Sequence, residues 1–423
     1  MMQKKGRDDD TYNTDFGGAF LLRGASPDVS SLVLTDSILR NNFALSDSGA
    51  IDSIDATVTA TDSIFENNES GGDGGVMWTD SDSTFERCRF EGNYADFNGG
   101  ALTFFGISRG TIIECEFHDN TSDNSGGAIY FSGNNMILEG CIFTTNSAED
   151  EGGAIYTSAN ERTEIRGCSF KENEAFWGGS IYTNFGYTEI VGATFECNEA
   201  YQVGGAIYSF NGEIELSESE FTSNTARGGG ALVFWFVTDI RISSCLFDGN
   251  EGANFGAGAI AYLAFGSSTF IASDNVFQNN KSLNPNQTSD DILDFLNAQD
   301  IQCGSDSGNC FCDADTNPSV GMNITTNDLP TTCSGAGRGL DCPGCHETVP
   351  VSCSSAISRA GAMTRSGIND FVGVEVFSSL MKNTDSPKLL ADTPADMMSE
   401  TMMKTKEKME EMNAKYLEKI GGR

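Results

Sequence analysis

The sequence contains little proline, few basic residues and no long apolar run. Proline occurs 8 times in 423 residues, whereas glycine occurs 48 times. Because proline removes a backbone donor from a sheet and glycine permits tight turns, this composition favours many short strands joined by turns. No apolar run approaches the roughly 18 residues that a transmembrane helix needs, so we expect no membrane span.

Basic residues are scarce where acidic residues are abundant. The chain has 25 Lys and Arg against 61 Asp and Glu, a net charge of −36, and residues 11–355 hold 48 of the acids and 12 of the bases. An acidic body repels phosphate backbones, so nucleic acid is excluded as a partner. We expect weak association of divalent cations, and the residues indicate no specific metal site and no cofactor.

Two motifs alternate along the chain. The first reads Gly-Gly-Ala-Ile-Tyr in its most regular copies, and its second glycine recurs about every 26 residues. The positions are Gly18, Gly49, Gly75, Gly100, Gly127, Gly153, Gly179, Gly205, Gly230 and Gly258. The second motif is Phe-x-x-Asn, whose phenylalanines are Phe65, Phe90, Phe117, Phe143, Phe170, Phe195, Phe221, Phe247 and Phe277, with Leu39 in the same place one repeat earlier.

The repeat predicts an all-β fold, a parallel β-helix of about ten coils. Apolar runs are short and broken by glycine, which excludes helical repeats. Equivalent residues of stacked coils form columns, and the residue after the motif alanine is always large and apolar, from Phe20 to Ile260. Since side chains alternate between faces of a strand, this column and the phenylalanine column should line the core.

The asparagine of Phe-x-x-Asn is present in all ten repeats. An amide side chain is both donor and acceptor, so stacked asparagines can bond to one another and to turn backbone. We predict an internal asparagine ladder. It consists of Asn42, Asn68, Asn93, Asn120, Asn146, Asn173, Asn198, Asn224, Asn250 and Asn280.

The best candidate for ligand binding is an outward column of aromatic residues. Tyrosines occupy the position after the motif isoleucine in four successive coils, and a tryptophan occupies it two coils earlier. Such a stripe could carry a sugar or a partner protein, or the rings could stack only for stability. The residues are Trp78, Tyr130, Tyr156, Tyr182 and Tyr208.

The two alternating motifs resemble the repeats of the chlamydial polymorphic outer membrane proteins over roughly residues 15–280. The resemblance implies a right-handed parallel β-helix displayed at a surface, often for adhesion. Those proteins end in an outer-membrane β-barrel, and residues 281–423 contain no alternating strands of that kind, so autotransport is not supported. The start of the sequence carries no signal peptide, and we expect the chain to be a fragment of a longer secreted protein.

The 13 cysteines fall into two sets and one residue apart. Cys88, Cys115, Cys141, Cys168 and Cys245 all precede the column phenylalanine by two residues, where other coils have small residues, so we expect inert buried thiols rather than disulfides between coils. Cys197 lies in a turn and indicates nothing alone.

The second set is concentrated in a segment poor in core residues. It predicts disulfides and an oxidising compartment, and because its number is odd, at least one partner lies elsewhere or stays free. A zinc site formed by Cys342, Cys345 and neighbouring thiols is one alternative, and covalent haem attachment at Cys342-Pro-Gly-Cys345-His346 is another that the segment supports less well. The set is Cys303, Cys310, Cys312, Cys333, Cys342, Cys345 and Cys353.

The sequence therefore divides into four regions. Residues 1–14 are expected to be disordered, 15–300 to form the β-helix, 301–355 to form a cysteine-rich disulfide region, and 356–423 to form a tail with an amphipathic helix near 395–420. Asn286 and Asn323 lie in Asn-x-Thr sequons that suit glycosylation in a secreted protein.

No catalytic constellation is recognisable. The chain has 2 histidines, and of these only His118 lies in the repeats. Paired carboxylates such as Glu114 and Glu116 alternate along a strand, which suits a solvated face better than a cleft. We predict an extracellular or cell-surface structural or adhesion module that contacts protein or glycan, with a carbohydrate-active β-helix enzyme as the alternative.

Overall fold

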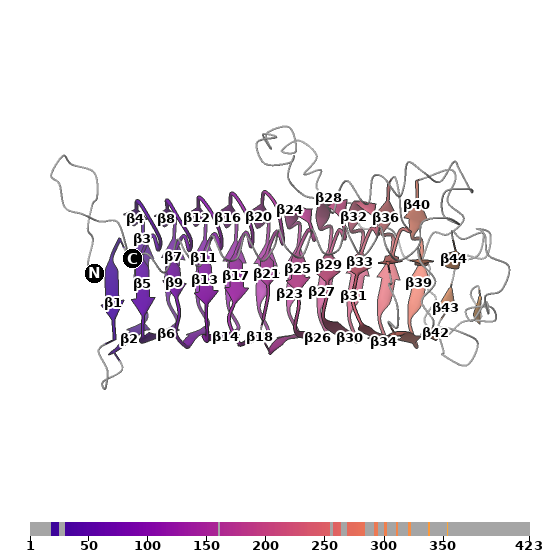
Figure 1. Ribbon diagram of the computed structural model, residues 1–423. Helices are drawn as coiled ribbons and strands as arrows, with labels where there is room; N and C mark the ends of the chain where they lie inside the picture. Colours follow the sequence, from indigo (N-terminus) through magenta and orange to yellow (C-terminus); the bar gives the residue numbers. More distant parts are fainter. Residues whose placement is uncertain are drawn as a thin grey trace, which may run out of the picture. The chain divides into compact units, whose positions relative to one another are not determined.

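The computed structural model describes residues 18–24, 30–159, 161–253, 257–263 and 269–283, with five short strands after residue 290 and Cys353. The described residues form parallel strands stacked along one axis and contain no helix (Figure 1). The predicted disorder of 1–14 and the predicted helix near 395–420 lie outside the described residues. Two units divide the chain, and the β-helix belongs to the first, residues 1–324 and 328–356.

Each coil contributes one strand to each of four parallel sheets, which we number I to IV in chain order. Sheet I holds the Gly-Gly-Ala-Ile-Tyr motif. Its strands are β1 (Phe20–Arg23), β5 (Ile51–Ile54), β9 (Met77–Thr79), β13 (Leu102–Phe105), β17 (Ile129–Ser132), β21 (Ile155–Thr157), β25 (Ile181–Asn184), β29 (Ile207–Phe210), β33 (Leu232–Trp235), β37 (Ile260–Leu263), β41 (Ile292–Asp294) and β44 (Val320–Met322).

Sheet II follows sheet I in every coil and carries the longest strands. They are β2 (Ser30–Thr35), β6 (Ala56–Thr61), β10 (Ser83–Glu86), β14 (Arg109–Ile113), β18 (Asn135–Glu139), β22 (Arg162–Arg166), β26 (Tyr187–Val191), β30 (Glu213–Ser217), β34 (Asp239–Ser243), β38 (Thr269–Ser273) and β42 (Asp300–Gln302).

Sheet III holds the column phenylalanine at the centre of three-residue strands. They are β3 (Ile38–Arg40), β7 (Ile64–Glu66), β11 (Arg89–Glu91), β15 (Glu116–His118), β19 (Ile142–Thr144), β23 (Ser169–Lys171), β27 (Thr194–Glu196), β31 (Glu220–Thr222), β35 (Leu246–Asp248) and β39 (Val276–Gln278), extended by β43 (Cys310–Phe311) and β45 (Gly337–Arg338). Strands β43, β44 and β45 therefore extend the sheets into the predicted cysteine-rich region.

Sheet IV has ten strands, one for each of the ten coils. They are β4 (Phe43–Ala44), β8 (Glu69–Ser70), β12 (Tyr94–Ala95), β16 (Thr121–Ser122), β20 (Ser147–Ala148), β24 (Glu174–Trp177), β28 (Glu199–Val203), β32 (Thr225–Gly228), β36 (Glu251–Gly252) and β40 (Lys281–Ser282). We number the coils 1 to 10 from β1–β4 to β37–β40. The predicted all-β parallel β-helix is confirmed.

Register between coils is set by the sequence columns. Ile129 pairs with Ile155, and Phe117 pairs with Phe143. The column phenylalanines from Phe65 to Phe277 stack with ring centroids 4.6 to 4.9 Å apart and nearly parallel planes. These rings are almost fully buried, so one continuous apolar core runs through all coils.

The two glycines of the repeat are required for different reasons. The first glycine has a left-handed backbone, as at Gly126 with φ of 69°. The second allows close approach, because a Cβ on Gly127 would lie 2.0 Å from the carbonyl oxygen of Gly153 in the next coil. No side chain fits there, so the second glycine sets the distance between coils at this corner.

Candidate functional site

The ten predicted ladder asparagines lie in one column at the corner between sheets III and IV. Nδ2 of Asn120 donates to Oδ1 of Asn146 at 3.0 Å and to the carbonyl of Phe90 at 3.0 Å. The backbone N–H of Asn120 donates to the same Oδ1 at 3.1 Å. The pattern repeats from coil to coil, so the amide donors and acceptors inside the ladder are paired.

The ladder is a structural element, because its amide groups bond to one another and to backbone and leave no donor or acceptor for a ligand. Its asparagines are 9% exposed at Asn42 and 5% or less elsewhere. The residue before each asparagine takes a left-handed conformation, for example Asp119 with φ of 51° and Thr145 with φ of 55°. The asparagine amide pairs the backbone that this sharp corner would otherwise leave unpaired.

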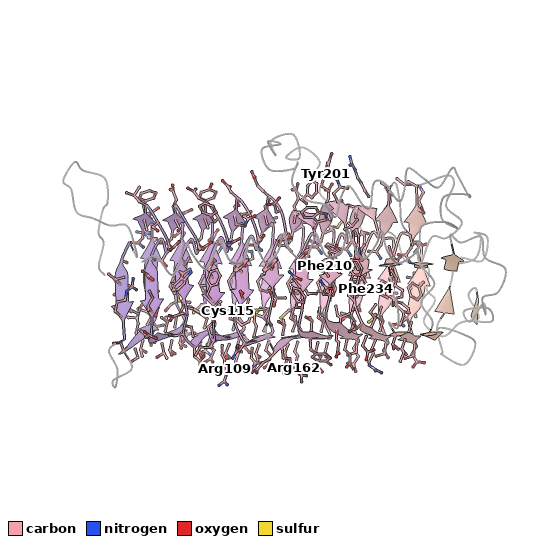
Figure 2. All side chains as sticks on the ribbon, in the orientation of Figure 1. Arg109, Cys115, Arg162, Tyr201, Phe210 and Phe234 are labelled. Carbon is pink, nitrogen blue, oxygen red and sulfur yellow. A yellow bond between two sulfur atoms is a disulfide. The ribbon has the colours of Figure 1, made fainter. Side chains whose placement is uncertain are left out.

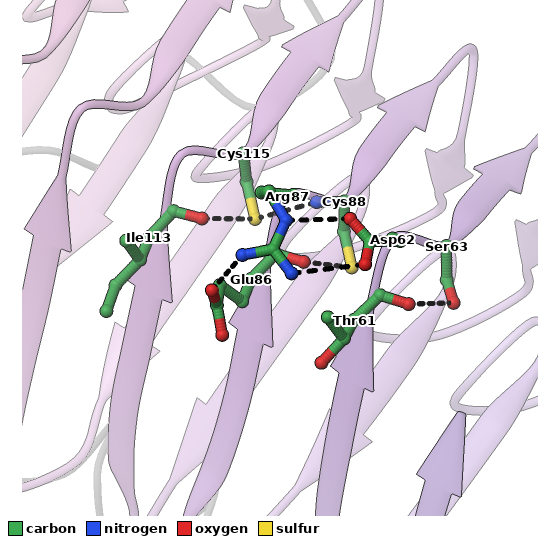
Figure 3. A network of polar contacts seen from close by, with 8 residues as sticks. All are labelled: Thr61, Asp62, Ser63, Glu86, Arg87, Cys88, Ile113 and Cys115. Carbon is green, nitrogen blue, oxygen red and sulfur yellow. Dashed lines mark hydrogen bonds and ion pairs between the residues drawn. The ribbon is translucent and has the colours of Figure 1, made fainter. Parts of the chain in front are cut away.

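The five cysteines that precede the column phenylalanine are buried free thiols. The backbone N–H of Cys88 donates to Sγ of Cys115 at 3.3 Å, and that thiol in turn bonds to the carbonyl of Ile113 (Figure 3). Burial raises the pKa of Cys245 to about 12. A buried thiol with a raised pKa holds its proton and is a poor nucleophile, which describes Cys115, Cys168 and Cys245. A side-chain hydrogen bond with Cys115 lowers the pKa of Cys88, and one with Cys168 lowers the pKa of Cys141.

One cysteine of the second set pairs with Cys197. The disulfide Cys197–Cys353 joins residues 156 apart in sequence, and Cys197 occupies the left-handed corner position that precedes ladder residue Asn198. The side chains of Cys303, Cys310, Cys312, Cys333, Cys342 and Cys345 lie outside the described residues. Sequence reasoning missed the role of Cys197, although the odd number in the second set meant that at least one of its cysteines either had a partner elsewhere or stayed free.

The predicted aromatic stripe is continuous from Tyr130 to Tyr208, but its rings do not lie flat on the surface. Tyr130 stacks on Tyr156 at 4.6 Å with planes 1° apart, and Tyr156 stacks on Tyr182 at 5.4 Å with planes 8° apart. Tyr208 meets Tyr182 edge to face at 5.1 Å. Ring faces therefore point along the solenoid axis at one another, and a sugar cannot lie on them.

The exposure of this column also differs from the prediction. Tyr156, Tyr182 and Tyr208 are only 8%, 6% and 6% exposed, whereas Trp78 and Tyr130 are half-buried. Of the two interpretations, a binding stripe or stacking for stability, the burial of these three tyrosines favours stacking.

Glu151 contacts the tyrosine column with its carboxyl group. Ser125 Oγ donates to Glu151 Oε2 at 3.1 Å, and the Tyr182 hydroxyl also donates to this carboxylate. Burial raises the pKa of Glu151 to about 7, the charge of Asp150 adds to the rise, and the two hydrogen bonds oppose it. The result is a carboxyl group that can hold or release a proton near neutral pH.

A group that we call the ledge, made of Phe176, Trp177, Tyr201 and Arg227, lies on sheet IV in coils 6 to 8. Register shifts occur between Ala175 and Trp177 and again in β28, so these strands bulge. Tyr201 is 45% exposed and projects from the edge formed by β24, β28 and β32 (Figure 2). Arg227 lies over its ring at 4.3 Å from the centroid.

A second group, the aromatic corner, lies where sheet I turns into sheet II in coils 7 to 9. It comprises Phe185, Phe210, Trp235 and Phe236. Phe210 lies between Asn184 and Trp235 in the strand register, and its ring meets the ring of Phe236 edge to face at 5.8 Å. Phe185 is 50% exposed. The sequence analysis singled out neither the ledge nor the aromatic corner. The feature that could have indicated them is the presence of aromatic residues at positions where other coils have small or polar ones.

The described residues contain no group of three or more His, Cys, Asp or Glu side chains arranged to hold a metal ion. In the same part of the chain no helix is long and apolar enough to cross a membrane. His118 Nε2 lies 3.4 Å from Glu116 Oε2 on an outward face of sheet III.

Comparison with known proteins supports the fold. A family model described as a right handed beta helix region matches residues 50–192. No curated protein and no solved structure matches the chain. The chain therefore folds as a right-handed parallel β-helix.

Proposed function

We propose that this chain is a structural and adhesive module of a cell surface or extracellular matrix. The observation that carries the proposal is the ledge, where bulged strands of sheet IV bring an exposed tyrosine, a tryptophan and an arginine together. Aromatic residues and arginine are the side chains that contribute most to binding at protein interfaces. The resemblance to chlamydial surface proteins supports the same function.

The core supports a passive role for most of the chain. The ladder amides are paired with one another and with backbone carbonyls, and the column phenylalanines stack on one another, so neither of these two columns offers a group for chemistry. A solenoid of this kind holds surface groups at fixed spacing, which suits contact with an extended protein or glycan.

Binding of the labelled full chain to cells and to immobilised matrix proteins and glycans tests the proposal. The double variant Tyr201→Ala with Arg227→Ala should lose at least about tenfold in affinity, as expected for an interface anchor. The control is Tyr94→Ala with Arg89→Ala, which removes the same residue types from coil 3. Equal binding by both variants and the wild type would contradict the assignment to the ledge.

A carbohydrate-active enzyme is the second candidate, and Glu151 is the observation that favours it. A carboxyl group with a pKa of about 7 beside a phenol is suited to general acid or base chemistry. Incubation of the purified chain with neutral and acidic polysaccharides, followed by analysis of new reducing ends, tests this candidate. Activity that disappears in Glu151→Gln would favour the enzyme over the adhesive module.

A further inference from the structure

We propose that the aromatic corner is a binding subsite for neutral oligosaccharides. This inference rests on the proposed function, because it names one ligand class for a binding module. It uses a surface separate from the ledge, formed by Phe185 in coil 7, Phe210 in coil 8 and Phe236 in coil 9.

The first argument is backbone strain. Phe185 has φ of 64° and Phe236 has φ of 60°, both in the left-handed region. Bulky residues are genuine outliers there, and glycine or asparagine normally occupies such positions. Coil 8, between them, has Asn211 with φ of 60°, and coil 4 has Gly106 at its corner. Phenylalanine is therefore unfavourable at both corners for the backbone, which indicates that the two rings have a function of their own.

The second argument is an unpaired acceptor beside Phe185. Asn184 is 9% exposed, and its Nδ2 donates to the Tyr156 hydroxyl at 3.5 Å. Its Oδ1 is buried and has no hydrogen-bond partner among the described residues. Such an acceptor is destabilising unless a donor reaches it. Sugar hydroxyl groups are donors, and the C–H face of a pyranose packs against aromatic rings.

The third argument is charge. The exposed carboxylate of Glu213 begins β30, directly after the corner of coil 8, and the chain carries a net charge of −36. This surface repels uronates and sulfated chains and offers acceptors to neutral hydroxyl groups. An apolar peptide can donate only its backbone N–H groups, whereas each ring of an oligosaccharide presents several hydroxyl donors. Neutral oligosaccharide is therefore the ligand class that fits both the rings and their polar surroundings.

Phe185→Gly is the decisive variant, because glycine adopts the left-handed backbone without strain. It removes the ring and should leave the chain at least as stable as the wild type. Asn211→Gly is the matched control, since it makes the same backbone change at the same corner of the next coil and removes no ring. Thermal unfolding of both full-length variants verifies that each one folds.

Titration calorimetry with neutral hexasaccharides of glucose, mannose, galactose, xylose and N-acetylglucosamine measures binding, with a galacturonate hexasaccharide and an apolar peptide as comparators. The wild type should bind at least one neutral compound, Phe185→Gly should weaken that binding about tenfold or more, and Asn211→Gly should retain it within about threefold.

Three results would overturn the inference: no neutral compound binds, Phe185→Gly binds as the wild type does, or only the peptide or the galacturonate binds. The ledge variant Tyr201→Ala with Arg227→Ala separates this failure from failure of the proposed function. Loss of cell or matrix binding in the ledge variant alone, with no neutral sugar bound, would reject the subsite and keep the adhesive module.

Discussion

Coils 2 to 5 and coils 6 to 9 share one interior and differ on the outside. Phenylalanine and asparagine columns pass through both halves without interruption. On the outside, sheet IV strands have two residues in β8 to β20, whereas β24, β28 and β32 have four or five. The ledge and the aromatic corner both belong to the second half. The repeated residues form the core. The function that we propose belongs to surface residues of the ledge and the aromatic corner, where the sequence differs from the repeat.

The largest effect should come from the glycine that both halves share. Gly127→Val would place side-chain atoms against the carbonyl oxygen of Gly153, where even a Cβ would lie 2.0 Å away. We expect a loss of more than about 4 kcal/mol or failure to fold, because backbone on both sides cannot yield.

Gly167→Ala is the comparison for that variant. A Cβ at Gly167 meets nothing within 4 Å, and only its φ of 58° opposes the change. The expected loss is about 1–2 kcal/mol, the usual difference for a left-handed residue. Chemical denaturation measures the loss in free energy of unfolding for Gly127→Val and Gly167→Ala. Equal losses would show that the close contact between coils is not the reason for glycine at position 127.

A smaller effect is expected from the ladder. Asn173→Ala removes the acceptor for the N–H and Nδ2 of Asn146 and should lower the free energy of unfolding by about 1–3 kcal/mol. Asn135→Ala, on the outward face of β18, should change it by less than about 0.5 kcal/mol. Thermal and urea unfolding check the pair, and a neutral Asn173→Ala would mean that the ladder does not stabilise either half.

The smallest effect is a pH dependence that arises at Glu151, at the end of coil 5, where the two halves meet. The pKa of Glu151 is raised from 4.5 to about 7 in the folded chain, so its protonated form is favoured by folding. This contribution is complete below about pH 4.5 and is lost as the pH rises through 7. The charged and titratable groups that face this carboxyl are Asp150, Tyr156, Tyr182 and Tyr208.

Glu151→Gln should therefore be more stable than the wild type at pH 8 and equal to it at pH 4.5. Urea unfolding at both values measures the difference, with Glu139→Gln, an exposed position on β18, as the control. A constant difference between Glu151→Gln and the wild type at the two pH values would rule out titration of Glu151 in this range.

The core could be predicted from the sequence because the same residue type recurs at the equivalent position of every coil. Nine copies of Phe-x-x-Asn, and a tenth with Leu39 in place of phenylalanine, locate a large apolar side chain inside and an asparagine at a corner, whatever the surrounding residues are. The outward residues vary more from coil to coil. The alternation of side chains along each strand placed the tyrosines on the outer face, but it did not decide between an open stripe and buried, stacked rings. The bulge in β24, the left-handed Phe185 and the pairing of Cys197 with Cys353 depend on single residues or distant ones, and no local pattern indicates them.

The corner at each ladder asparagine has a consequence for how the length of this molecule can change. Asn120 and Asn146 are 26 residues apart and occupy equivalent places, and the phenylalanines of their coils are 4.7 Å apart along the axis. Because each coil contacts only its neighbours, deletion or duplication of residues 121–146 joins matching backbone to matching backbone. Such changes would move the ledge and the aromatic corner nearer to or farther from the first coil in fixed steps, so the coils of the first half act as a spacer of adjustable length.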